Sequence, residues 1–108
     1  MCHCLACQQR TGSVFGAQAR FPRAQIESIV GRAKEYVRTA DSGNKLTFRF
    51  CPDCGSTVYY TIETAPDVIA VPLGGFADPG FPPPRVQVYV ERAHPWAKVP
   101  DGIKTEGH

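Results

Sequence analysis

The sequence predicts a mainly β protein, with antiparallel sheets around metal sites. Three observations lead to this prediction. Several short runs alternate apolar and polar residues, 10 glycines and 10 prolines favour turns, and five cysteines lie in two tight clusters. The chain has the length of one domain, so we expect a single domain over residues 1–108. A hydrophobic content of 43% with 20% charged residues excludes a disordered chain.

The first half of the chain predicts three strands. Apolar groups occupy the odd positions of residues 15–21, which is the period of a strand, and Pro22 should end it. Residues 23–30 can form a short helical turn. Residues 35–40 and 45–50 read as strands on either side of an Asp-Ser-Gly-Asn turn, which predicts a β-hairpin.

The second half continues the same pattern. Residues 57–63 and 68–73 are rich in residues that favour strands. Residues 78–84 hold four prolines and must be a loop. Residues 85–92 alternate valines with polar side chains and predict a further strand, whereas the tail over residues 93–108 has little periodicity.

Charge and targeting signals narrow the functional classes. Twelve Lys and Arg residues against ten Asp and Glu residues give a net charge of +2 without a basic block, which argues against nucleic acid as a partner. No apolar run approaches the length of about 20 residues that a membrane helix needs. The chain shows no signal peptide, so we predict a cytoplasmic protein whose thiols stay reduced and bind metal.

Cys51 and Cys54 form a Cys-Pro-Asp-Cys-Gly turn, which is typical of half a closed zinc site. Pro52 restricts φ inside this turn, and Gly55 can take a positive φ after it. The alternative is a redox Cys-x-x-Cys motif. That motif needs a βαβ setting, and none is visible in the sequence.

Cys2, Cys4 and Cys7 form a second cluster. In an extended segment, residues two apart project to the same face, so Cys2 and Cys4 can reach one ion, and Cys7 follows at a suitable spacing. Three protein ligands leave the fourth position of a tetrahedral zinc open, as in catalytic sites. His3 should point away from its two neighbours.

Spacing alone permits two partitions of the five cysteines. Cys4, Cys7, Cys51 and Cys54 can form one structural site that leaves Cys2 over. Alternatively, Cys2, Cys4 and Cys7 hold one zinc while Cys51 and Cys54 hold half of another. Depending on the partition, the chain carries one or two Zn²⁺ ions. Spacing by itself favours the first partition.

Several motifs occur in the order of a known family. They are Cys2-His-Cys-Leu-Ala-Cys7, Arg10-Thr-Gly-Ser13, Phe50-Cys-Pro-Asp-Cys-Gly-Ser56, residues 66–72, Gly75-Phe76 and Trp96. The sequence resembles the glutathione-dependent formaldehyde-activating enzymes, whose domain is shared with centromere protein V. The resemblance implies an Mss4-like (β-tent) fold, a catalytic zinc on Cys2, Cys4 and Cys7, and half of a structural zinc on Cys51 and Cys54.

In that family, the other half of the structural site comes from an earlier Cys-x-Cys-Gly strand, which this sequence lacks before Met1. The domain therefore looks short at its N-terminus. A partner chain can supply such a strand, and an unpaired sheet edge favours association. A homodimer is accordingly one of our hypotheses.

The resemblance implies a carbon–sulfur lyase that forms or cleaves S-hydroxymethylglutathione, with a small thiol and an aldehyde as substrates. Arg10 can hold a carboxylate of glutathione, or it can be a solvated surface charge. The competing hypothesis is a zinc-stabilised binding module without turnover. An enzyme acting on a different thiol or aldehyde is the third alternative.

Overall fold

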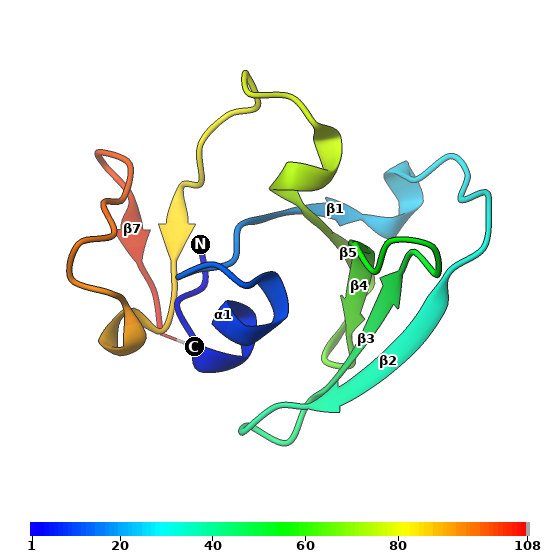
Figure 1. The fold of residues 1–108 in the computed structure, drawn as a ribbon, viewed down its shortest axis with the longest axis horizontal. Helices are drawn as coiled ribbons and strands as arrows, with labels where there is room; N and C mark the ends of the chain where they lie inside the picture. Colours follow the sequence, from blue (N-terminus) through cyan, green and yellow to red (C-terminus); the bar gives the residue numbers. More distant parts are fainter. Residues whose placement is uncertain (108) are drawn as a thin grey trace. The chain divides into compact units, whose positions relative to one another are not determined.

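The computed structural model describes residues 1–107, which divide into two compact units (Figure 1). Unit 1 combines the start of the chain, Met1–Gln18, with the described residues from 76 onward. Unit 2 is the intervening segment, Ala19–Gly75. The two cysteine clusters fall in different units, the triplet in unit 1 and the pair in unit 2.

Unit 2 is built on a five-stranded sheet with the strand order β1-β5-β4-β3-β2. The strands are β1 (Gln18–Pro22), β2 (Lys34–Thr39), β3 (Lys45–Phe50), β4 (Thr57–Ile62) and β5 (Ala65–Pro72). Strands β2 to β5 pair in antiparallel hairpins, which confirms the predicted mainly β fold (Figure 1).

The core of unit 2 lies on one face of this sheet. Phe48 and Tyr60 are opposite each other on β3 and β4, with their ring centroids 4.9 Å apart. Ala70 of β5 continues the row, and Leu46 and Ile62 pack beside it. The alternation predicted for residues 45–50 is therefore correct, because every second side chain of β3 points to this face.

The first and last residues of several other predicted elements differ from those in the structure. The first strand begins at Gln18 rather than at residue 15, and the helical turn over residues 23–30 shrinks to the 3₁₀-helix η1 (Arg23–Gln25). The strand predicted over residues 85–92 is too long, since the structure has only β6 (Val86–Gln87) there. The chain turns away after β6 because Tyr89 adopts a φ of 56° and the 3₁₀-helix η3 (Val90–Arg92) follows it.

Unit 1 contains the one α-helix of the described residues, α1 (Leu5–Thr11), which the sequence analysis did not predict (Figure 1). Gly12 ends α1 in the left-handed conformation with a φ of 67°, and its N–H donates to the Gln8 carbonyl. Strand β6 pairs in parallel with β7 (Lys104–Thr105) from the tail. A seven-residue helix is too short to show a helical period in its sequence. The 3₁₀-helix η2 (Leu73–Phe76) follows β5 along the chain.

Candidate metal centre

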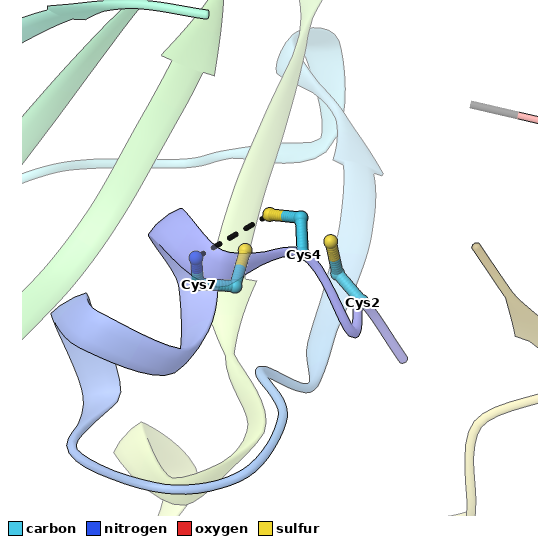
Figure 2. A group of neighbouring side chains, drawn as sticks. All are labelled: Cys2, Cys4 and Cys7. Carbon is cyan, nitrogen blue, oxygen red and sulfur yellow. Dashed lines mark hydrogen bonds between the residues drawn. The ribbon is translucent and has the colours of Figure 1, made fainter. Parts of the chain in front are cut away.

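Three thiols converge at the start of unit 1. The sulfur atoms of Cys2, Cys4 and Cys7 lie within 4.8 Å of one another, and Figure 2 shows them pointing toward one another from the start of α1 and the segment before it. Cys2 and Cys7 are buried and Cys4 is half-buried. Among residues 1–107, this is the one group of three or more metal-ligating side chains. The predicted triplet is therefore brought together.

Backbone pairing holds the segment that carries Cys2. The Cys2 N–H donates to the Gly16 carbonyl at 2.8 Å, and the Gly16 N–H donates back to Cys2 at 2.9 Å. On the other side, the His3 N–H donates to the Val88 carbonyl at 3.1 Å, and Val88 donates to Met1. The segment is thus extended and bonded on both sides, like a central strand of a sheet. Cys2 cannot move without breaking these backbone hydrogen bonds.

Cys4 and Cys7 are positioned by the beginning of α1. Cys4 is the N-cap residue in extended conformation, and the backbone N–H of Cys7 donates to its sulfur at 3.3 Å (Figure 2). The same bond satisfies a backbone donor that the first helical turn leaves open. An extended residue followed by a helical turn is what places the sulfurs of Cys2, Cys4 and Cys7 on one side.

Arg10 lies one helical turn after Cys7 and is half-buried beside this thiol, and its role in holding a carboxylate stays a prediction. A hydrogen bond from Cys2 lowers the pKa of Cys7 to about 5, and Arg10 contributes to this lowering through its charge and a hydrogen bond. The hydrogen bond with Cys7, together with burial, raises the pKa of Cys2. In the metal-free protein, these opposite shifts favour the proton on Cys2 and the negative charge on Cys7 within this pair.

Gly16 makes room for this arrangement. A Cβ at residue 16 would lie 3.4 Å from Arg10 Nη2, 3.4 Å from Cys7 Cβ and 3.7 Å from Cys7 Sγ. The close approach of the Gly16 backbone therefore lets the arginine and the thiol share one side of the segment.

His3 lies outside the thiol group, as predicted. Its ring is fully buried, and its Nε2 atom makes a 2.9 Å hydrogen bond with Gln87 Oε1. The amide of Gln87 in turn donates to Thr105 Oγ1 at 3.1 Å. His3 therefore ties the ligand segment to β6 and β7 rather than serving as a ligand.

Gln8 is a structural residue that the sequence analysis missed. Its Nε2 atom donates to the His3 carbonyl at 2.8 Å and to the Arg92 carbonyl at 3.0 Å, while its Oε1 atom bonds His94 Nε2 at 2.9 Å. The His94 ring also meets Trp96 edge-on at 5.9 Å. No spacing rule identifies such a residue, because its partners are up to 86 positions away in the sequence.

Cys51 and Cys54 lie at the tip of the hairpin formed by β3 and β4. The Cys51 N–H donates to the Ser56 carbonyl, and the Gly55 N–H donates to the Cys51 carbonyl. Gly55 has the predicted positive φ, 80°. The Cys54 sulfur is 3.3 Å from Ser56 Oγ, and hydrogen bonding with Ser56 lowers the pKa of this exposed thiol. The turn thus presents two thiols close together, and the partition of the five cysteines stays a prediction.

A separate hollow lies on unit 2, away from any cysteine. It has a volume of about 440 Å³, and its lining includes Val37, Lys45, Thr47 and Glu63. None of the predicted site residues lines it, so concavity alone does not identify the chemistry of this chain.

The donor set of the triplet fits zinc. Tetrahedral thiolate sites have a metal–sulfur distance of about 2.3 Å, which puts neighbouring sulfurs roughly 3.8 Å apart. The observed limit of 4.8 Å is close enough for small side-chain rotations to close the group around one ion. Soft thiolates favour zinc over magnesium or calcium, which prefer oxygen.

Comparison with known proteins agrees with this chemistry. Residues 1–92 match the family model described as "Glutathione-dependent formaldehyde-activating enzyme". A search of curated proteins finds no match. The matched range contains residues of both units and includes Cys2, Cys4 and Cys7. The match therefore does not support the expectation that the domain lacks an N-terminal Cys-x-Cys-Gly strand. No helix among residues 1–107 is long and apolar enough to cross a membrane.

Proposed function

The family match covers 92 of the 108 residues, so the chain belongs to the glutathione-dependent formaldehyde-activating enzyme family, which has an Mss4-like fold. On this premise, we propose that the protein is a zinc-dependent carbon–sulfur lyase. Its reaction is the condensation of glutathione with formaldehyde, or the reverse. A bond forms between the thiol sulfur and the aldehyde carbon, and the thiol proton ends on the new hydroxyl group. Family membership and the convergence of three thiols support this proposal.

Cys2, Cys4 and Cys7 would hold the zinc. When bound, zinc supplies a Lewis acid and favours the thiolate form of a coordinated thiol. Three protein ligands leave one tetrahedral position for a substrate. The rest of the protein's contribution is positioning: backbone bonds fix Cys2, and the helix start fixes Cys4 and Cys7.

Arg10 has two proposed roles. Three thiolates around a divalent ion carry a net negative charge, which weakens the attraction for an electron-rich substrate atom. The Arg10 guanidinium beside Cys7 offsets part of this charge. Its fork of N–H donors is also suited to a carboxylate of glutathione, as the sequence predicts.

For Cys51 and Cys54, we propose half of a closed structural zinc site. The hairpin turn holds both thiols at knuckle spacing, and hydrogen bonding with Ser56 favours the thiolate form of Cys54. The remaining ligands come from outside this pair, and a bound ion would stabilise the β3–β4 tip.

The experiment replaces zinc with Co²⁺ and adds glutathione. We expect the visible absorption bands of the cobalt protein to shift, because the glutathione thiol takes the open position. S-methylglutathione should cause no shift, since it lacks the thiol. Cys2→Ser should abolish the response, whereas Cys51→Ser is the matched control that keeps it. Unchanged bands at saturating glutathione would contradict the open site.

Turnover requires a separate measurement. Exchange spectroscopy of ¹³C-formaldehyde with glutathione measures how fast S-hydroxymethylglutathione forms and breaks. We expect the zinc protein to accelerate exchange above the uncatalysed rate, and Arg10→Gln to reduce the acceleration. A cobalt response without any acceleration would instead favour the zinc-stabilised binding module.

A further inference from the structure

The edge strand β2 presents an exposed apolar centre. In the strand order of unit 2, β2 is the last strand and pairs only with β3. Tyr36 is 59% exposed and Val37 is 52% exposed, and both lie in the middle of this six-residue strand. Sheet edges are usually protected by proline, a bulge, a short strand or charged side chains. β2 has no proline and no bulge along its pairing with β3, and its charged residues, Lys34, Glu35 and Arg38, lie on either side of the apolar centre.

The alternation of hydrogen bonds shows which backbone groups face outward. The Ala40 N–H donates to the Asn44 carbonyl at 2.8 Å, which marks this pair as a hydrogen-bonded pair. Because bonded and non-bonded pairs alternate in an antiparallel ladder, the even-numbered residues of β2 bond β3. The N–H and C=O groups of Glu35, Val37 and Thr39 therefore point away from the sheet.

From this edge we propose that β2 pairs with β2 of a second copy of the chain, in antiparallel orientation, with Val37 facing Val37. A two-fold axis perpendicular to the sheet relates the copies, so both sheets join into one. Glu35 then faces Thr39 of the second copy. These pairs use the outward backbone groups on both strands.

Charge selects this register over its neighbours. With Val37 at the axis, Tyr36 faces Arg38 of the second copy, and an arginine over an aromatic ring is attractive. Shifting the axis to Tyr36 would place Lys34 opposite Arg38. An axis at Glu35 would place Glu35 opposite Glu35 of the second copy, and an axis at Arg38 would place Arg38 opposite Arg38. Like charges directly opposite one another destabilise a ladder, and of these four registers only the Val37-centred one avoids them. An axis at Thr39 would also avoid them, but it would leave Thr39 as the only residue of β2 that pairs with β2 of the second copy.

The side chains of Glu35 and Arg38 fit this arrangement as they stand. Glu35 is held by Arg49 of its own chain at 2.7 Å, so it does not need a cation from the second copy. The Arg38 guanidinium lies 5.5 Å from the centre of the Phe48 ring on the core face. It is therefore already aligned along the face on which Tyr36 of the second copy would lie.

Sedimentation equilibrium of the zinc-loaded protein tests this proposal. We expect the wild type to reach twice the mass of one chain at high micromolar concentration. Val37→Lys should be monomeric, because the axis places two lysines opposite each other. Val58→Lys is the matched control and should still dimerise, since Val58 is 48% exposed on the interior strand β4. A monomeric wild type, or a dimeric Val37→Lys variant, would overturn the proposal.

A mixture of oppositely charged variants tests the register itself. Val37→Lys and Val37→Asp should each be monomeric alone, yet form a heterodimer when mixed, because only self-pairing at residue 37 brings the two new charges together. Circular dichroism checks that each variant is folded. Failure of the mixture to associate, with both variants folded, would rule out the Val37-centred register.

Discussion

The Arg10 guanidinium lies beside the Cys7 thiol, one turn later on α1. The hydrogen bond from Cys2 and the charge of Arg10 both lower the pKa of Cys7. This relationship places a positive charge against the metal ligand that comes from the helix. The space beside this contact is limited at Gly16, since a Cβ at residue 16 would lie 3.4 Å from both Arg10 Nη2 and Cys7 Cβ.

The ionisation of Cys7 in the metal-free protein should follow this electrostatic pattern. Its folded pKa of about 5 lies below the ordinary value of 9.0, so the ionised form contributes stability above the unfolded pKa, and this stability is lost as pH falls through about 5. Because Cys7 is buried, we expect the ultraviolet absorbance of its thiolate, taken as the difference from a Cys7→Ser variant, to be present between these two values. Arg10→Gln should move this titration to higher pH, and an unchanged titration would contradict the contact.

Residue 16 should tolerate only a small side chain. Gly16→Ala puts a methyl group at contact distance and should preserve zinc binding. Gly16→Val adds two further carbons against Cys7 and Arg10, and such overpacking costs about 1–3 kcal/mol. We expect weaker zinc affinity for the valine variant in a competition with a chelator. Equal affinities for alanine and valine would show that the gap is larger than described.

Gln8 should stabilise unit 1 far more than its neighbour Gln9. Gln8→Ala removes bonds to the His3 and Arg92 carbonyls and to the His94 ring, and unsatisfied partners of this kind cost about 1–3 kcal/mol. Gln9 is exposed, so Gln9→Ala is the control on the same helix. Urea unfolding followed by Trp96 fluorescence measures both variants. Equal midpoints would mean that the three Gln8 bonds contribute nothing.

Phe48 should dominate the stability of the sheet in unit 2. It is buried against Tyr60 with Ala70 beside it, so Phe48→Ala should cost about 3–5 kcal/mol. Val58→Ala on the neighbouring strand removes an exposed side chain and should change the free energy of unfolding by less than about 0.5 kcal/mol. Urea unfolding followed by circular dichroism gives both values. A small loss for Phe48→Ala would place the main core elsewhere.

Local pattern was enough to predict the five strands of unit 2, although not their order, and β5 begins at Ala65 rather than at residue 68. Strand β3 was predicted with its observed bounds and β2 within one residue, because their alternation and the turn between them are properties of neighbouring residues. The convergence of Cys2, Cys4 and Cys7 follows from the family resemblance, since cysteine spacing alone favours one site of Cys4, Cys7, Cys51 and Cys54.

The features of the fold that the sequence does not predict depend on contacts between distant residues. The short helix α1 and the end of β6 at Tyr89 have no periodic signal, and the bonds of Gln8 and His3 reach partners more than 80 positions away. The strands of unit 2 are encoded in short-range alternation along the chain, and the thiol triplet is recognisable from the motifs of the family. The packing of Gly16 against Cys7 and Arg10, and the place of β2 at the edge of its sheet, are visible only in the folded structure, because both depend on which segments pack together.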